Sequence, residues 1–395
     1  MKDHKIKVAL VCDWLTNVGG AEKLLLELHR LFPDAPIYTS KYNKKKIDWF
    51  EDADVRTGWL QIFPTALRRF LGVFRQWYFS HLDLSDYDVV ISVTGAEAKA
   101  IKKGNAIHFC YCHVPTQYYW QMYDDYVKNP GFGILNPFVR LMFKLFVGPL
   151  RKADYKAAQK PDHFITISEY AKEMIKKYYK RDAVVINPPV EINDFKIKES
   201  TCQTIEKNKT KKSQCGDYPQ LVENLDIATT YITTSRQVNW KRIDLAIAAC
   251  LKTQKHLLII GEGPEHSQLV KMANGSQYIH FLPIMNKEQL KYYLAQAKGF
   301  IFPSLEPFGI APVEALSSGC PVIAFGKGGA IDYVKDGANG LLFEKQTVSS
   351  LAAAIEKFEG MSFDRKKVSD SADYFSIERF DKEIMEYING KTQQN

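Results

Sequence analysis

Glu306 and Glu314 are the residues of this sequence best placed to do chemistry. They frame the end of an apolar run, GFIFPS at 299–304, and a helix predicted to begin near Phe308. The free N–H groups at a helix start favour negative charge, and ligands of α/β proteins usually bind where parallel strands end. The pair could therefore accept hydrogen bonds from the hydroxyls of a hexose and a ribose whose phosphates lie at the helix start. Alternatively, both glutamates only cap and decorate the helix.

Two cations, Arg236 and Lys241, follow the strand expected at 227–235, on a loop that leads into a helix at Ile243. Cations placed just past a strand end can neutralise a diphosphate while a glycosidic bond breaks and negative charge develops. Their position matches that of the glutamate pair, at the end of another strand of the same half. The alternative is a solvated surface pair with no ligand.

The first half of the chain offers a glycine turn and a histidine. Gly19 and Gly20 stand between a strand at 8–13 and a strongly helical segment, so the backbone there can approach an anionic ligand closely. His113 ends a strand at 107–112 and could donate a hydrogen bond to a hexose hydroxyl or to the leaving oxygen. A tight connection and a structural histidine are the alternatives. The glycine fingerprints of nicotinamide and ATP sites are absent from the sequence.

Two further strand ends could form the walls of a nucleobase site. Gly261 and Gly263 lie in a GEGP sequence after one strand, and Ile284 follows the next. Backbone amides and carbonyls at such ends can read the edge of a base.

Apolar runs alternate with helical stretches along both halves of the chain, a pattern that predicts parallel sheets with crossover helices. We expect strands at 5–13, 36–40, 53–57, 87–94, 106–112, 163–167 and 183–186, and then at 227–235, 256–261, 278–282, 299–303, 321–325 and 341–343. A chain of 395 residues favours two domains. We place them at 1–188 and 189–375, with a helix at 376–395 that packs back toward the first, and we interpret 195–225 as a linker or surface loop.

Composition limits the function classes. Seven cysteines without a C-x-x-C pair argue against a disulfide framework or a zinc site, and we expect no metal. The sequence has no run of about 18 apolar residues and no secretory signal, so we expect an intracellular protein. Residues 55–160 hold fourteen Lys or Arg against seven Asp or Glu, which is most of the net charge of +8. No nucleic-acid motif accompanies that charge, so we expect no nucleic acid partner.

Within this basic stretch, residues 63–79 alternate aromatic and leucine side chains with Arg68, Arg69 and Arg75. Such a segment can lie on an anionic membrane surface, with the rings in the interface and the guanidinium groups on phosphates. The alternative is an amphipathic core helix with a solvated basic edge.

Taken together, these motifs resemble family 4 of the retaining glycosyltransferases, which have the GT-B fold of two Rossmann-like domains facing across a cleft. The likeness rests on EPFGIAPVE at 306–314, GGAE at 19–22, SR-x4-K at 235–241 and GEGP at 261–264. The resemblance implies that the donor sugar is held by Glu306 and the amides of Phe308, Gly309 and Ile310, the ribose by Glu314, and the diphosphate by Arg236, Lys241 and Gly20. It also makes His113 an active-site residue and implies that no cofactor is needed, the nucleotide diphosphate sugar being the donor substrate.

The segments at 110–120, 162–190 and after Glu306 are similar to those of bacterial transferases that use GDP-mannose to build lipid-linked surface polysaccharides. Those often have an arginine where this chain has Gln117. The expected function is transfer of a hexose, best mannose, to a lipid-linked or glycan acceptor by a cytoplasmic protein peripheral to the inner face of the membrane. Alternatives are a UDP-sugar-dependent transferase, a non-catalytic nucleotide-sugar-binding partner of another transferase, and a sugar epimerase.

Overall fold

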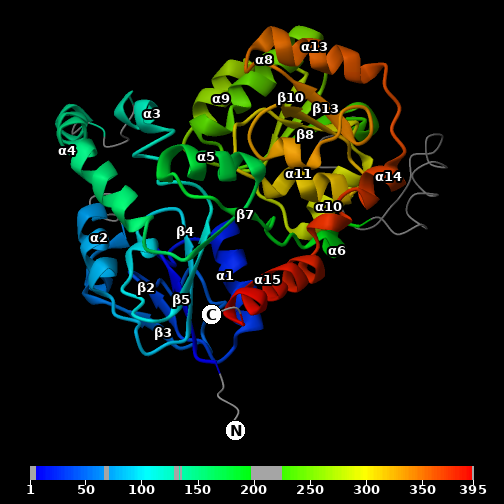
Figure 1. The fold of residues 1–395 in the computed structure, drawn as a ribbon. Helices are drawn as coiled ribbons and strands as arrows, with labels where there is room; N and C mark the ends of the chain where they lie inside the picture. The colour runs from blue at the N-terminus through cyan, green and yellow to red at the C-terminus, as the bar shows by residue number, and fades with distance from the viewer. Residues whose placement is uncertain (1–5, 66–70, 129–132, 134–135, 197–224, 394–395) are drawn as a thin grey trace. The chain divides into compact units, whose positions relative to one another are not determined.

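The computed structural model describes residues 6–65, 71–128, 133, 136–196 and 225–393, and divides the chain into two units (Figure 1). The first, which we call the N-terminal unit, comprises Met1–Pro188 together with Phe380–Asn395. The second, the C-terminal unit, comprises Pro189–Arg379. Each unit is built around its own parallel sheet.

The sheet of the N-terminal unit has seven parallel strands among the described residues, in the order β3-β2-β1-β4-β5-β6-β7. Its strands are β1 (Val8–Cys12), β2 (Ile37–Thr39), β3 (Val55–Thr57), β4 (Val89–Thr94), β5 (Ile107–Cys112), β6 (His163–Thr166) and β7 (Val184–Val185). The central strand β4 is buried along its whole length, as expected for a strand covered on both faces. The order reverses between β1 and β4, and this point is where ligands of doubly wound sheets bind.

Helices connect these strands (Figure 1). They are α1 (Gly20–Leu31), α2 (Gly72–His81), α3 (Tyr123–Lys128), α4 (Asn136–Ala157) and α5 (Glu169–Tyr179). The last helix of the chain, α15 (Ile377–Thr392), returns to this unit: Asp381 pairs with Arg30, and the ring of Tyr387 lies 6.1 Å from that of Phe109.

The sheet of the C-terminal unit has six parallel strands in the described part, in the order β10-β9-β8-β11-β12-β13. Its strands are β8 (Tyr231–Thr234), β9 (Leu257–Ile260), β10 (Ile279–Leu282), β11 (Gly299–Phe302), β12 (Val322–Phe325) and β13 (Gly340–Phe343). The order reverses between β8 and β11. Any residue that follows either of these two strands is therefore at the switch point of the sheet.

The helices of this unit are α6 (Ile192–Phe195), α8 (Ile243–Thr253), α9 (His266–Ala273), α10 (Lys287–Gln296), α11 (Ile310–Ser317), α12 (Ala330–Tyr333), α13 (Val348–Glu359) and α14 (Arg365–Asp370). Ile247 of α8 and Ile355 of α13 belong with Ile259, Ile301 and Ile323 of the strands to one fully buried cluster. This cluster anchors the strands whose carboxyl ends carry the site.

A strand overlaps each of the thirteen predicted ranges. The strand expected at 227–235 begins only at Tyr231, because Ile227–Thr229 forms a 3-10 turn. Helix α10 starts with a capping box formed by Asn286 and Gln289. The helix expected near Phe308 begins instead at Ile310. Its N-cap is Gly309, whose φ of 95° is not helical and delays the first turn. The loop expected at 195–225 lies almost entirely outside the described residues.

The membrane interpretation of 63–79 was wrong for one of its three arginines. Arg75 is buried, and its guanidinium Nε lies 3.0 Å from a carboxylate oxygen of Glu97, so it faces a buried acid and not a lipid phosphate. Arg68 and Arg69 lie outside the described residues. No helix in the described part of the chain combines the length and the apolar character that crossing a bilayer requires.

Candidate functional site

An ion pair occupies the switch point of the C-terminal sheet. Lys241 lies in a short 3-10 turn, Asn239–Lys241, after β8, and Glu306 follows β11. The Nζ atom of Lys241 lies 2.6 Å from Oε2 of Glu306, and the Ser304 hydroxyl donates to Oε1 at 2.7 Å. Both oxygens of the carboxylate are thus held. The structure brings together the cation and the acid that the sequence placed at separate strand ends.

The backbone behind Glu306 is fixed by the turn after β12. The amide of Gly329 donates to the Glu306 carbonyl at 2.8 Å, and the Tyr333 hydroxyl donates to the Phe308 carbonyl at 2.8 Å. A Cβ atom at Gly328 would lie 2.5 Å from the Glu306 carbonyl oxygen, and one at Gly329 would lie 2.4 Å from the Phe308 Cα. Only glycine allows these two loops to approach so closely.

Helix α11 starts directly after this loop. Gly309 is its N-cap, and the amide of Ile310 opens its first turn, where N–H groups have no acceptor within the helix. Glu314 stands one turn further along α11 and is partly buried. Glu306, Phe308 and Gly309 therefore lie on one continuous loop that leads into the helix start at Ile310.

Arg236 lies in the loop after β8, and its side chain is exposed. Hydrogen bonds to the loop after β9 fix the backbone on both sides of it. The amide of Ser235 donates to the Ile260 carbonyl at 3.2 Å, and the amide of Gln237 donates to the Glu262 carbonyl at 2.8 Å. Arg236 thus lies in a loop that hydrogen bonds hold in place on both sides of the residue.

Glycine is required in this loop pair. A Cβ atom at Gly261, where φ is 127°, would lie 2.3 Å from the Ser235 carbonyl oxygen, and one at Gly263 would lie 2.3 Å from the Gln237 carbonyl oxygen. The observed role of these glycines is close packing of two loops beside the switch point. Their predicted contact with a nucleobase remains a prediction.

Sequence reasoning missed Gln237, which is fully buried between these loops. Its side-chain amide donates to the Gly261 carbonyl at 2.6 Å, and its Oε1 lies 2.8 Å from Nδ1 of His266. Its partners are 24 and 29 residues away in sequence, so no local spacing pointed to them.

Ile284 follows β10, the edge strand of the sheet, and its side chain is 73% exposed. Two strands, β9 and β8, separate β10 from β11 in the sheet order. Ile284 is therefore the predicted site residue furthest along the sheet from Glu306.

In the N-terminal unit, Asp13 follows β1 and forms hydrogen bonds to the end of β4, the strand next to the one that His113 follows. Its carboxylate accepts hydrogen bonds from the Thr94 hydroxyl at 2.9 and 3.0 Å, from the Gly95 amide at 3.0 Å and from the Ala98 amide at 2.8 Å. The Thr94 carbonyl in turn accepts from the His113 amide at 2.9 Å. The ends of β1, β4 and β5 are thereby tied at the switch point. The role of Asp13 could not be predicted from local sequence, because its partners lie over 80 residues away.

Burial lowers the pKa of His113 to about 4, although a hydrogen bond to the Thr94 backbone opposes the shift. The imidazole is therefore neutral at physiological pH. Its Nε2 is buried and has no hydrogen-bond partner among the described residues. A buried ring nitrogen without a partner is uncommon and suits a ligand hydroxyl.

Gly19 and Gly20 open α1 near the same switch point. Gly19 is the N-cap of this helix and offers no side chain to its first amides, and Gly20 is the first helical residue. Gln117 lies in the turn after β5, where its carbonyl accepts from the amides of Trp120 and Met122 at 3.2 and 3.0 Å.

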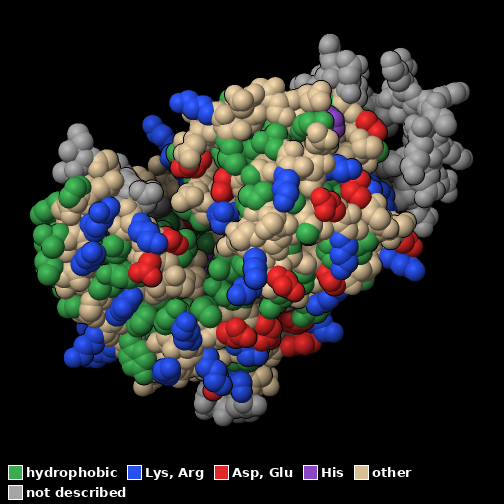
Figure 2. All heavy atoms as spheres, turned by 90° about the horizontal axis from the view of Figure 1, so that it is seen from above, with side chains coloured by type: hydrophobic (Ala, Val, Ile, Leu, Met, Phe, Trp, Pro, Cys, Tyr) green, Lys and Arg blue, Asp and Glu red, His purple; other side chains and the backbone are tan. Residues whose placement is uncertain are grey.

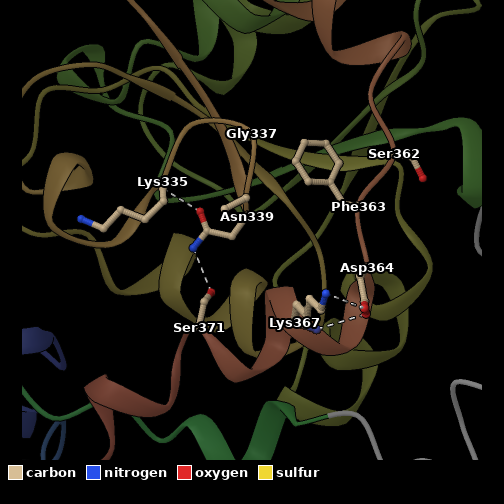
Figure 3. A pocket seen from close by; sticks show the side chains of 9 residues that line it. Lys335, Gly337, Asn339, Ser362, Phe363, Asp364, Lys367 and Ser371 are labelled. Atoms are coloured by element: carbon tan, nitrogen blue, oxygen red, sulfur yellow. Dashed lines mark hydrogen bonds and ion pairs between the residues drawn. The ribbon is translucent and has the colours of Figure 1, made fainter.

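A cavity of about 340 Å³ in the C-terminal unit is separate from this site (Figure 3). It opens beside the turn before β13 and the segment after α13, at the end of the sheet where the strands begin. Its lining residues are Lys335, Gly337, Ala338, Asn339, Ser362, Phe363, Asp364, Lys367 and Ser371. The side-chain amide of Asn339 donates hydrogen bonds to the Tyr333 carbonyl and to the Ser371 hydroxyl. None of the predicted site residues lines this cavity.

In the comparison with known proteins, the family match lies within the C-terminal unit. Residues 226–373 match the family described as glycosyl transferases group 1, and the matched segment contains Arg236, Lys241, Glu306 and Glu314. The chain is 24% identical to human alpha-1,3/1,6-mannosyltransferase ALG2 over 378 residues, 87% of this chain and 85% of that protein. A shorter match, 29% identical over 29% of this chain, is to the uncharacterized glycosyltransferase YqgM of Bacillus subtilis, of which it covers 34%.

Solved structures match over nearly the whole chain. Anabaena HepE in complex with UDP superposes with a TM-score of 0.66 at 18% identity, covering 98% of this chain and 100% of that one. WaaG, a glycosyltransferase involved in lipopolysaccharide biosynthesis, superposes with a TM-score of 0.64 at 15% identity, covering 97% and 100%. The two parallel-sheet units thus have the architecture of the two Rossmann-like domains of the GT-B fold, and residues 226–373 are similar to the glycosyl transferases group 1.

Proposed function

We propose that this protein is a retaining hexosyltransferase that uses a nucleoside diphosphate sugar. The observation that carries the proposal is the ion pair of Lys241 and Glu306 at the switch point, on the loop that leads into the first turn of α11. A cation, helix-start amides and a carboxylate supply what a sugar diphosphate needs: counter-charge for the phosphates and an acceptor for the sugar hydroxyls.

The chemistry follows from these groups. The bond between the anomeric carbon and the diphosphate oxygen breaks while the acceptor oxygen attacks the same face of the sugar. The departing diphosphate takes the acceptor proton, and Arg236 and Lys241 compensate the charge that develops on it. Neutral His113 would bind a sugar hydroxyl through Nε2, which has no hydrogen-bond partner in the described part of the chain. No metal or organic cofactor has a step in this scheme.

Mannose from GDP-mannose is our preferred donor, because ALG2 proteins of several organisms, named as mannosyltransferases, match most of the chain. A UDP-sugar is the alternative, since HepE was solved with UDP and with UDP-glucose. For the acceptor we propose a lipid-linked or glycan hydroxyl at an anionic membrane surface. Phe74 and Trp77 on α2 have exposed rings, which supports the proposal that aromatic side chains of residues 63–79 contact a membrane surface.

The test begins with a panel of GDP- and UDP-sugars and their effect on the melting temperature, because a ligand that binds the native state raises it. The stabilising sugar is then incubated with the protein, with and without acceptor glycans, in the presence and absence of EDTA. We expect one donor to stabilise the protein and to be transferred with its anomeric configuration kept, with or without EDTA. If a nucleotide sugar stabilises the protein but is neither transferred nor slowly hydrolysed, the protein is a nucleotide-sugar binder and not a transferase.

A further inference from the structure

The outward face of α4 is apolar, which is the reverse of what a surface helix normally presents. Phe138, Leu141, Leu145 and Phe146 are 63%, 55%, 60% and 55% exposed. Three of them, Phe138, Leu141 and Leu145, recur at spacings of three and four residues and therefore lie along one face of the helix. Val147, on the opposite face, is buried. Single exposed apolar residues are ordinary, but four on three turns of one helix indicate an interaction surface.

A buried ion pair fixes the orientation of this helix. Asp154 of α4 pairs with Lys99 at 2.7 Å. Its carboxylate also accepts from Thr116 at 2.8 Å, Trp120 at 2.7 Å and Tyr179 at 2.8 Å. Rotating α4 to hide its apolar face would leave two buried charges without partners, which is strongly unfavourable. The apolar face must therefore point away from the unit.

The exposed charges on α4 are all basic. The helix carries Arg140, Lys144, Lys152 and Lys156 as exposed side chains. Its single acidic residue, Asp154, is buried and neutralised by Lys99. The neighbouring α3 has acids of its own, Asp124 and Asp125, together with Lys128, so the basic surplus belongs to α4. Lys144 lies among the apolar residues in sequence, and Lys152 and Lys156 follow them.

We propose that α4 docks the N-terminal unit on the surface of an anionic phospholipid bilayer. The helix lies in the plane of the interface, with its phenylalanine and leucine side chains among the acyl chains and its lysines on the lipid phosphates. Figure 1 draws α2 on the same side of the unit, and Figure 2 shows hydrophobic side chains gathered at that edge. Phe74 and Trp77 of α2 are exposed, and the exposed ring of Trp59 packs against both. The inference deepens the proposed function, since it places a lipid-linked acceptor beside the enzyme.

The test measures binding of the full chain to vesicles of phosphatidylcholine alone and of phosphatidylcholine with phosphatidylglycerol, by flotation. We expect binding to the anionic vesicles and little to the neutral ones. The double variant Leu141→Gln with Leu145→Gln should lose most of it. The variant Lys144→Gln with Lys152→Gln should bind anionic vesicles roughly tenfold or more weakly, since each lysine near the surface contributes about fivefold.

The matched control is Val270→Gln with Met272→Gln, which removes two exposed apolar side chains from α9 of the C-terminal unit. It should bind vesicles like the unmodified protein, and all variants should keep their melting temperature. Equal vesicle binding by the leucine variant and the unmodified protein would overturn the proposal. So would a dimer, seen by light scattering without lipid, that the leucine variant converts to monomers, because the face would then bind a second copy. Vesicle binding needs no donor, so its failure leaves the transferase assignment untouched.

Discussion

Lys241 and Glu306 are paired at 2.6 Å, so the cation assigned to the diphosphate already has a counter-ion within the protein. A donor that brings its own negative charge competes with Glu306 for this lysine. We infer that donor binding moves the lysine toward the phosphates and frees the glutamate for a sugar hydroxyl. The ion pair would then link diphosphate binding to recognition of the sugar.

Replacing the acid should separate binding from turnover. In Glu306→Gln the lysine loses its counter-ion, so we expect UDP or GDP to bind at least as tightly as before. Turnover should fall about 100-fold or more, the range seen when one group that stabilises developing charge is removed. The control is Glu359→Gln, which removes the ion-pair partner of Lys255 away from the switch point of this unit. Calorimetry and initial rates give the two readouts, and near-normal turnover in Glu306→Gln would contradict the assignment.

Gln237 should act as a positioning residue for Arg236. Gln237→Glu keeps the size of the side chain but removes the donor to the Gly261 carbonyl, which is left unpaired in a buried place at a cost of about 1–3 kcal/mol. We expect lower stability in urea and, because the arginine loop loosens, roughly tenfold weaker nucleoside diphosphate binding. Gln296→Glu is the control, since its side-chain amide donates to the Tyr292 carbonyl within α10. A loss of stability with unchanged diphosphate affinity would reduce Gln237 to a structural role.

Gly309 should tolerate no side chain. Its φ is 95°, and a Cβ atom would lie 2.6 Å from a ring carbon of Phe302. Gly309→Ala therefore combines strain with a clash, and we expect it to lower the free energy of unfolding by about 3 kcal/mol or more. Gly337→Ala separates the two effects, because Gly337 has a φ of 78° but nothing within 4 Å of the added carbon. It should cost only about 1 kcal/mol. Equal losses in the two variants would show that crowding at Gly309 is unimportant.

The stability of the protein should fall as the pH drops below about 6.5, in part because of His113. Burial lowers the pKa of this residue to about 4, so between the two values the unfolded chain binds a proton that the folded chain does not. At pH 5 this penalty is about 2 kcal/mol relative to pH 7. His113→Gln should remove that share of the pH dependence, measured by urea unfolding at the two pH values. An identical pH dependence in both proteins would show that His113 is not buried as described.

Much of the architecture could be predicted from local sequence patterns. Each strand is a short apolar run, and the alternation with helices indicated parallel sheets, so the positions of all thirteen strands could be predicted to within a few residues. The loop and helix start at 306–310 followed from one continuous segment. Local patterning also placed Lys241 and Glu306 at strand ends. It could not show that the two residues touch, because the sheet order that makes β8 and β11 neighbours is a tertiary property.

The buried polar groups were beyond sequence reasoning for the same reason. Arg75 looked like part of an exposed basic face, yet its partner is Glu97, 22 residues later, beyond any spacing within one helix. Asp154 is the single acid of the basic helix α4, and only the fold shows that it pairs with Lys99. The apolar face of α4 was missed because its residues resemble those of a core helix until their exposure is known.

The most direct measurement is the affinity of the unmodified protein for UDP and GDP, compared by calorimetry with that of Lys241→Ala and of the control Lys255→Ala. Lys255 also forms an ion pair in the C-terminal unit, at 2.8 Å from Glu359, but it lies away from the switch point. We predict that Lys241→Ala weakens binding of the preferred nucleotide about tenfold or more, the effect of one lost charge-assisted contact of 1.5–3 kcal/mol. Lys255→Ala should leave the affinity unchanged. Equal affinities in all three proteins would contradict the claim that this end of the C-terminal sheet holds the diphosphate.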